Sequence, residues 1–288
     1  MAGLVKKFLA SASVVASMSA VFGAPAMAAT FTSSGTDIIL REQVGTSLQV
    51  TNDITKLDSI LQGDSSNPGG NVELGAKNVG QTQGANPLAT VQAQNAQGET
   101  AKFTNVTENI YSSSDWLNGV GRAWFSDAWE QAVERNSSAP LVSSATEGLF
   151  YSIFIDEGGL DMITDPNISY INEVGDDIVV GLASPLNLGD RFSDPFLAGA
   201  LDGVQISEIF AYDINGVTGY AWSTVATETG LGGSFSGNYE VVLEGLANGY
   251  VSQEVLESSP EDIPEPSTVL GLIAIGGLVA ATKRKVQK

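Results

Sequence analysis

The chain has 288 residues and carries 33 acidic against 13 basic side chains, for a formal net charge of −20. It contains no cysteine and no histidine, which excludes disulfides, a thiolate nucleophile, a Ser-His-Asp triad and metal sites built from thiolates or imidazoles. Once two terminal segments are set aside, about 235 residues remain, with 32 acidic and 7 basic side chains. So negative a surface repels phosphate backbones, and we expect no nucleic-acid partner.

Residues 1–28 are typical of a secretory signal peptide. Lys6 and Lys7 precede an apolar stretch, and Ala26-Met27-Ala28 has small residues at Ala26 and Ala28, the pattern that signal peptidase reads. We therefore expect cleavage after Ala28 or Ala29 and export of the remaining chain. An N-terminal anchor helix that is never cleaved is the alternative interpretation.

The C-terminal segment, residues 264–288, has three parts. Pro264-Glu265-Pro266 comes first, a 13-residue apolar run at 269–281 follows, and Lys283, Arg284 and Lys285 come next. A helix over the apolar run reaches about 20 Å, and snorkelling lysines extend its effective span toward the roughly 30 Å hydrocarbon core. The basic cluster is expected to stay cytoplasmic, so the chain before Pro264 lies outside.

This tail resembles the PEP-CTERM sorting signal, whose partner is the membrane enzyme exosortase. The resemblance rests on the tripeptide Pro264-Glu265-Pro266, the apolar helix, the basic cluster and their position at the C-terminus. It implies transient anchoring in the membrane by the C-terminal helix, processing by exosortase, and then a place at the cell surface or outside the cell. A plain C-terminal anchor is the alternative, and it leaves the tripeptide unexplained.

Between the ends, the patterns predict strands, then two helices, then strands again. The first helix begins near Ser112-x-x-Asp115 and continues with apolar residues at three-to-four spacing. The second begins at the capping box Ser144-x-x-Glu147 and ends at Gly158-Gly159. Residues 62–87 are expected to form a long surface loop with at most one short strand, at 71–75. The predicted strands are 36–42, 47–50, 90–94, 100–104, 167–172, 178–183, 205–214, 217–225 and 238–246.

This order of elements predicts a mainly β protein with a single β-sandwich or jelly-roll-like domain. The domain covers residues 29–250 and includes a two-helix insert at about 113–158. An acidic spacer at 251–263 connects it to the sorting tail at 264–288.

A second resemblance concerns residues 110–246. The helix that ends in Gly158-Gly159, the segment Thr164-Asp165-Pro166-Asn167-Ile168-Ser169-Tyr170 and the strand that ends in Gly181-Leu182-Ala183 resemble a family of cyanobacterial PEP-CTERM proteins of unassigned function. This resemblance implies secretion, and it carries over no catalytic residue.

Carboxylates are the only residues in the sequence that are candidates for binding a cofactor, and three interpretations of them stay open. They form a solvated acidic surface, or loop carboxylates hold calcium, or two of them form a glycosidase pair, for which the sequence singles out no residues. We expect no cofactor and no catalytic residue, with calcium as the alternative. The calcium candidates are Asp156, Asp161, Asp165, Asp176 and Asp177.

Aromatic side chains offer one candidate ligand platform. Tyr220 and Trp222 are separated by one residue on a predicted strand, so both rings lie on the same face of a sheet, as part of a core or of a binding ledge. The other tryptophans, Trp116, Trp124 and Trp129, stand at helical spacing, which favours core positions.

These observations lead to one leading function and two alternatives. We expect a non-enzymatic, exported surface or extracellular-matrix protein that associates with exopolysaccharide and has a structural or interaction role. A carbohydrate-binding module, with or without calcium, is the first alternative, and a secreted glycoside hydrolase is the second. Signal peptidase, exosortase, the membrane and extracellular polysaccharide are the expected partners.

Overall fold

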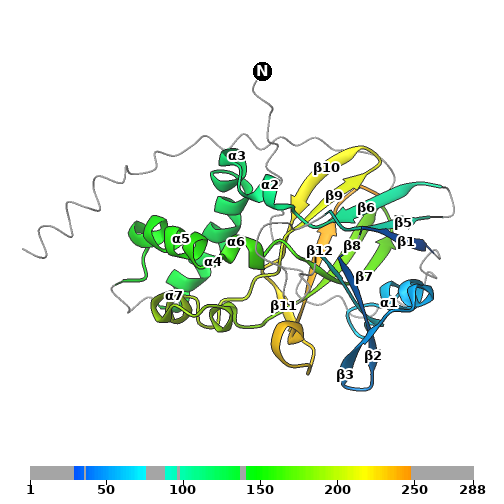
Figure 1. Cartoon of the computed structure of the whole chain (residues 1–288), viewed down its shortest axis with the longest axis horizontal. Coiled ribbons are helices and arrows are strands. Elements are labelled where there is room, and N and C mark those ends of the chain that lie inside the picture. The colour runs from blue at the N-terminus through cyan, green and yellow to red at the C-terminus, as the bar shows by residue number, and fades with distance from the viewer. Residues whose placement is uncertain (1–28, 36, 76–87, 96–97, 137–140, 248–288) are drawn as a thin grey trace, which may run out of the picture. The chain divides into compact units, whose positions relative to one another are not determined.

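Two antiparallel β-sheets and a group of short helices make up the described part of the chain (Figure 1). The computed structural model describes residues 29–35, 37–75, 88–95, 98–136 and 141–247. The predicted signal peptide, the acidic spacer and the sorting tail lie outside these residues. None of the helices in the described ranges is long and apolar enough to cross a membrane.

The smaller sheet has five strands in the order β1-β5-β6-β9-β10. All neighbouring strands in this sheet pair antiparallel, and two of the strand connections are tight hairpins. In the β9–β10 turn, Asn215 and Gly216 both have positive φ (52° and 84°), which suits the Asn-Gly dipeptide. The strands are β1 (Thr30–Ser34), β5 (Thr90–Gln94), β6 (Thr100–Thr104), β9 (Phe210–Ile214) and β10 (Val217–Ala221).

The larger sheet has seven strands in the order β11-β12-β8-β7-β4-β2-β3. Strand β4 lies between β2 and β7, so the one short strand that the sequence allowed at 71–75 is present, and it is an interior strand. The strands are β2 (Ile38–Val44), β3 (Ser47–Thr51), β4 (Gly70–Leu74), β7 (Asn167–Val174), β8 (Asp177–Ser184), β11 (Ala226–Glu228) and β12 (Gly237–Leu243).

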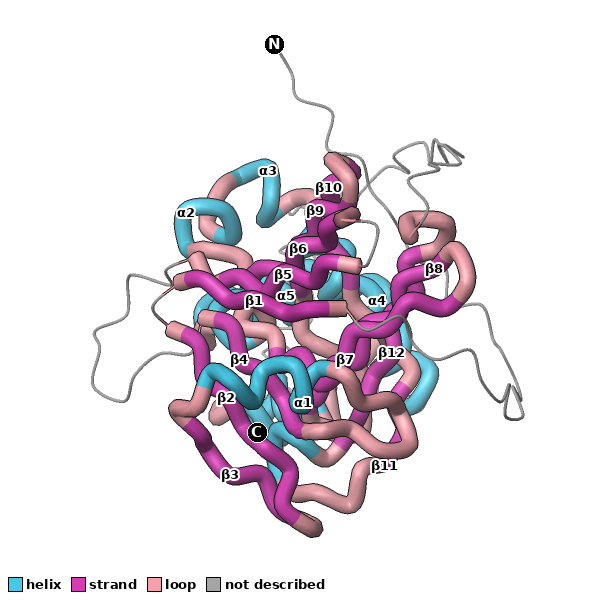
Figure 2. The backbone as a smooth tube through the Cα atoms, turned by 90° about the vertical axis from the view of Figure 1, so that its right-hand side faces the viewer, coloured by secondary structure: helices cyan, strands magenta, loops and turns pink. Residues whose placement is uncertain are grey.

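The strands of the two sheets are seen as a backbone tube in Figure 2. Side chains from the two sheets form one continuous core, which we call the sandwich core. Alternate residues supply it, for example Val91 and Ala93 on β5 and Val241 and Leu243 on β12. Helix α1 (Leu57–Leu61), which follows the turn η1 (Ile54–Lys56), adds three buried aliphatic side chains to this core. Each such side chain contributes about 1.5–3 kcal/mol by burial.

The helices α2 to α7 gather at one end of the sandwich (Figure 1). They form a second core, the helical core, which is dominated by aromatic rings. The elements are α2 (Glu108–Tyr111), α3 (Ser114–Leu117), α4 (Val120–Arg135), η2 (Ser144–Thr146), α5 (Glu147–Asp156), α6 (Gly159–Met162), η3 (Leu188–Arg191) and α7 (Pro195–Ala200); a last turn, η4 (Gly233–Phe235), precedes β12.

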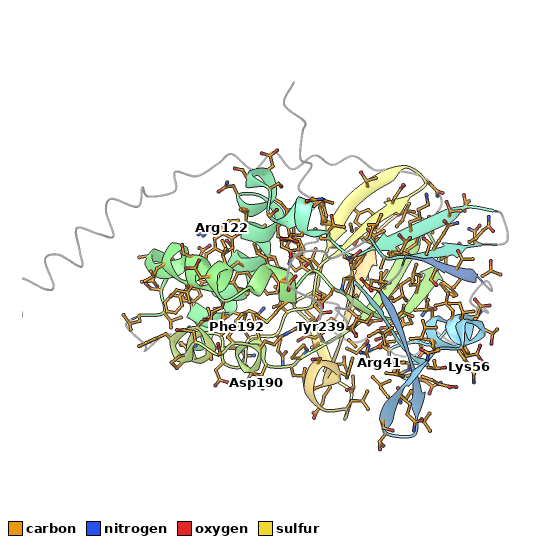
Figure 3. All side chains as sticks on the ribbon, in the orientation of Figure 1. Arg41, Lys56, Arg122, Asp190, Phe192 and Tyr239 are labelled. Carbon is orange, nitrogen blue, oxygen red and sulfur yellow. The ribbon has the colours of Figure 1, made fainter. Side chains whose placement is uncertain are left out.

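The three tryptophans at helical spacing are core residues, as the sequence predicts. Trp124 is 1% exposed, stacks on Phe154 at 5.6 Å between ring centroids and donates its indole N–H to the Ser207 carbonyl at 2.8 Å. Trp129 stacks on Phe125 at 5.9 Å and donates to the Ser143 carbonyl at 2.9 Å. In Figure 3, Phe192 and Arg122 lie among these helices, whereas Arg41 and Tyr239 lie among the strands.

The mainly β architecture is confirmed, but the two-helix insert is wrong in detail. The first predicted helix is divided into α3 and α4, because the chain leaves helical geometry at Gly119, where φ is −114° and ψ is −104°. Helix α2 comes before the predicted start at Ser112. The capping box also lies one residue earlier than expected: Ser143 and Thr146 cap η2 reciprocally. Helix α7 comes after β8, outside the predicted insert, and Asp194 caps its first turn.

Candidate functional site

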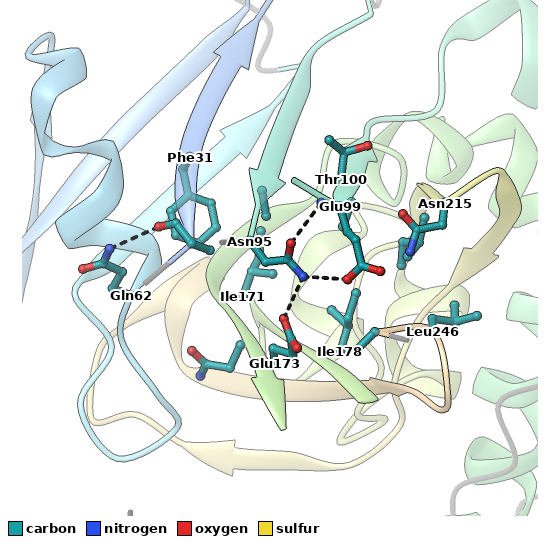
Figure 4. Close-up of a pocket in the computed structure, with 16 residues that line it drawn as sticks. Phe31, Gln62, Asn95, Glu99, Thr100, Ile171, Glu173, Ile178, Asn215 and Leu246 are labelled. Carbon is teal, nitrogen blue, oxygen red and sulfur yellow. Dashed lines mark hydrogen bonds between the residues drawn. The ribbon is translucent and has the colours of Figure 1, made fainter. Parts of the chain in front are cut away.

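A cavity of about 190 Å³ lies between the two sheets at the end of the sandwich away from helices α2 to α7 (Figure 4). Three hairpin turns surround it: β5–β6, β7–β8 and β9–β10. The opposite ends of β6, β7, β8 and β9 lead to or from the helical region, so the strands themselves separate cavity and helices. The volume is below the roughly 300–1,000 Å³ of sites for drug-sized ligands.

Aliphatic side chains from both sheets form the floor of the cavity. Ile171 and Ile178 come from the larger sheet, and Ala101 and Ile214 come from the smaller one. All of them belong to the sandwich core, so the cavity is the place where this core opens at its end. The polar residues along the rim are Gln62, Asn95, Glu99, Thr100, Asn172, Glu173 and Asn215.

Two carboxylates converge on one amide at the rim. The Asn95 Nδ2 atom donates to Glu99 Oε2 at 2.8 Å and to Glu173 Oε2 at 3.5 Å (Figure 4). Asn95 is fixed in turn, because its Oδ1 atom accepts the backbone N–H of Glu99 at 2.9 Å. One side-chain amide therefore links a turn of the smaller sheet to a strand of the larger sheet.

The remaining wall of the cavity is held by the β7–β8 turn. Asp177 Oδ1 accepts the backbone N–H of Gly245 at 2.8 Å, and the Asp176 carbonyl accepts that of Ala247 at 2.9 Å. These bonds fold the chain that follows β12 back over the cavity. On the other side, Gln62 donates to the Ala29 carbonyl at 3.4 Å.

Ala29 and Ala247 both line the cavity. The predicted signal peptide joins the domain directly before Ala29, and the segment leading to the tail joins it after Ala247. Both terminal segments are therefore attached covalently at the cavity end of the sandwich.

A buried charge cluster lies at the other end of β7, beside the helices. Glu208, which is 2% exposed, accepts a hydrogen bond from Arg191 at 2.7 Å and two from the backbone and side chain of Asn167, each at 3.1 Å. Asp165 is partly buried, and its Oδ1 atom is buried without a hydrogen-bond partner. A second ion pair, Arg41–Glu73, lies on the neighbouring strands β2 and β4.

Burial determines the ionisation of this cluster. Burial, reinforced by the negative charge of Glu208 and opposed by Arg191, holds the pKa of Asp165 well above its usual value. Burial also raises the pKa of Glu208, against the opposing effect of Arg191. Two carboxylates thus share one guanidinium, which favours the protonated form of Asp165.

The calcium candidates do not meet in one place. Asp156, Asp161 and Asp165 lie at the helical end of β7, and Asp161 accepts the Tyr111 hydroxyl at 2.9 Å. Asp176 and Asp177 lie at its other end, roughly 25 Å away for a strand of this length. Among the described residues, no three carboxylates lie close enough together to hold a metal ion.

Tyr220 and Trp222 pack partly against the helical core. The Trp222 indole donates to Asp127 Oδ2 at 2.8 Å, and the Tyr220 ring meets Trp116 edge-on at 6.5 Å. Only the exposed remainder of each ring is available to a ligand. The predicted processing residues Ala26, Ala28, Pro264, Glu265, Pro266, Lys283, Arg284 and Lys285 lie outside the described residues.

Sequence analysis did not select Asn95, Glu99 or Glu173. The two hairpins that carry them are predicted correctly, but their meeting across the sandwich is not a local property. A usable signal exists: Asn95 and Glu99 flank the turn of one predicted hairpin, and Glu173 borders the turn of another. Hairpin turns of facing sheets meet at the same end of a sandwich.

Comparison with known proteins identifies one feature, the PEP-CTERM protein-sorting motif, at residues 262–285. The match includes Pro264-Glu265-Pro266, the apolar run and the basic cluster, and it confirms the resemblance found in the tail. A cyanobacterial origin stays a prediction. No curated protein and no solved structure matches the chain.

Proposed function

We propose that this exported, exosortase-processed chain acts without catalysis, as a structural or interaction protein of the cell surface or the extracellular polysaccharide matrix. The sorting motif at residues 262–285 carries this proposal, because it marks a substrate of exosortase. The motif places the sandwich and its cavity outside the cell, where a matrix polysaccharide is within reach.

The acidic domain supports a role in a hydrated matrix. Its surplus of carboxylates keeps it soluble and prevents close association with other acidic surfaces. The buried, aromatic helical core and the buried charge cluster support a scaffold role for the helical end. The cavity at the opposite end is then the part available for interaction.

Carbohydrate binding is the second candidate, and the cavity favours it. Amide and carboxylate side chains at the rim can form hydrogen bonds with the hydroxyl groups of a sugar, while the apolar floor contacts its ring carbons. Hydrolysis is less well supported by the same residues. A glycosidase must hold the two sugar units on either side of the bond that it cleaves, and a cavity of about 190 Å³ is small for that task.

The processing step is tested with two triple-alanine variants in the native host. In the first, Pro264, Glu265 and Pro266 become alanine; in the matched control, Ser259, Pro260 and Glu261 become alanine, which removes a proline and an acid outside the motif. We expect wild type and control to lose the tail and leave the membrane, and the first variant to stay there at full length. Equal membrane-bound masses for all three would contradict exosortase processing.

The matrix role is tested by fractionating the same cultures. We expect most of the processed wild-type protein to co-purify with surface polysaccharide and to be released when that polysaccharide is digested. Processed protein that appears only free in the medium, with or without digestion, would contradict the matrix role and leave the processing result intact.

A further inference from the structure

The charge at the cavity rim is unbalanced. Glu99 and Glu173 share one neutral donor, the Asn95 amide, and no described lysine or arginine forms an ion pair with either carboxylate. A carboxylate accepts hydrogen bonds at about four positions. The Asn95 amide NH2 group offers two N–H donors, so among the described residues the two carboxylates keep most of their acceptor positions for a ligand or for water.

The lining selects against an anion. The described lining residues include two carboxylates and no basic side chain, so a phosphate, sulfate or uronate group would be repelled by two negative charges and attracted by no positive one. The aliphatic floor formed by Ile171, Ile178 and Ile214 lowers the local dielectric, which strengthens attraction between the carboxylates and a cation. A ligand with a positive, hydrogen-bond-donating group fits these walls.

The residues that line the cavity favour one kind of cation over another. Recognition of quaternary ammonium groups uses a cage of aromatic rings, and Phe31, which is 7% exposed, is the one aromatic residue among the described lining residues. Amide and carboxylate oxygens around the rim instead suit a primary ammonium, which offers three N–H donors. The cavity above the small apolar floor has space for one small ring or alkyl group attached to the ammonium.

We propose that the cavity binds a primary ammonium group, held by Glu99 and Glu173 over the aliphatic floor. Two sources offer this group. One is a small extracellular amine, with an amino sugar as the best match to the proposed function on which this assignment rests. The other is the α-amino group that signal-peptide cleavage creates at Ala29 or Thr30. Ala29 lines the cavity, and the next residue, Thr30, pairs with Gln94, the neighbour of Asn95 in the chain.

Calorimetric titration with three sugars of the same ring tests the assignment. Glucosamine carries the ammonium, N-acetylglucosamine keeps the nitrogen without its charge, and glucose has a hydroxyl. We expect the full-length precursor, kept in detergent, to bind glucosamine at least about tenfold more tightly than either neutral sugar. Glu173→Gln should remove that preference, whereas Glu228→Gln, an exposed carboxylate on the edge strand β11, should leave it unchanged.

The processed protein from the culture medium distinguishes the two sources. Glucosamine binding to both forms identifies a free amine as the ligand; binding to the precursor alone places the chain's own terminal ammonium in the cavity after cleavage. Equal affinity for glucosamine and glucose, no binding to either form, or full binding by Glu173→Gln would overturn the assignment. None of these outcomes affects tail processing or matrix retention, so failure here is distinguishable from failure of the proposed function.

Discussion

The two ends of the domain are built on different principles. At the helical end, large aromatic side chains interlock, the buried indole N–H groups of Trp124 and Trp129 are paired, and Arg191 neutralises the buried carboxylate of Glu208. At the cavity end, the core is aliphatic and opens between the sheets, and two carboxylates share a single donor. The rim carboxylates are partly exposed, and the described residues pair neither of them with a cation, so the cavity end is the better candidate for binding a ligand.

The largest loss of stability is expected in the helical core. Trp124→Ala removes a ring that is 1% exposed, together with its bond to Ser207, and should lower the free energy of unfolding by about 3–5 kcal/mol. Trp222→Ala is the matched control, because that ring is partly exposed. Urea denaturation followed by circular dichroism measures both. Equal losses of unfolding free energy for the two variants would contradict the distinction between the helical core and the Tyr220–Trp222 ledge.

The next effect concerns the buried charge cluster. Arg191→Met leaves Glu208 buried without its guanidinium and should cost about 3 kcal/mol at neutral pH. Arg122→Met breaks the more exposed pair with Glu147 and is expected to cost about 1 kcal/mol or less from the lost ion pair. The same denaturation experiment compares them. A cost for Arg191→Met no larger than for the control would contradict a structural role for the buried pair.

Asp165 should make stability depend on pH. Its folded-state pKa is raised, so the unfolded chain releases this proton first as pH increases, and stability is lost from about pH 4 up to the folded pKa. Asp165→Asn removes this contribution and should be more stable than wild type at pH 7. Thermal unfolding between pH 4 and pH 8 measures the slope. If the stability of Asp165→Asn declines with pH as steeply as that of wild type, the pH dependence comes from another group.

The smallest change is expected at the cavity. Glu173→Gln and Glu99→Gln keep side-chain size, and because these groups serve a ligand in our account, each should change stability by less than about 0.5 kcal/mol. Asp177→Ala removes the acceptor of the Gly245 N–H, so it serves as the structural comparison and should cost more. If Glu173→Gln is the more destabilising change, the rim carboxylates are part of the scaffold.

The sequence predicted what local signals determine. The hairpins around residues 95–98, 174–177 and 215–216 are correct, because turn residues and alternating strands lie next to one another along the chain. In the Gly- and Asn-rich segment 62–87 it allowed one short strand at 71–75, and β4 lies there. The composition gave no sign that this strand is interior, because its place between β2 and β7 depends on distant segments.

The site depends on contacts that no local pattern specifies. Asn95 and Glu173 are 78 residues apart in sequence, and they meet only because two sheets pack face to face. Asp165 was selected as a calcium candidate for its charge, yet its surroundings of Glu208 and Arg191 come from distant segments. By contrast, the residues of the sorting tail are contiguous in sequence. The prediction of a sorting signal from Pro264-Glu265-Pro266 is confirmed by the match to the PEP-CTERM motif.

The division of roles between the two ends is tested most directly with the four tryptophans, none of which is among the residues lining the cavity. Their indole N–H signals can be followed by nuclear magnetic resonance while glucosamine is added to the full-length chain. Our account predicts backbone shifts at Asn95, Glu99 and Glu173 with all four indole signals unmoved. Shifts of the Trp222 indole without changes at those three residues would place the ligand on the Tyr220–Trp222 ledge and contradict the account.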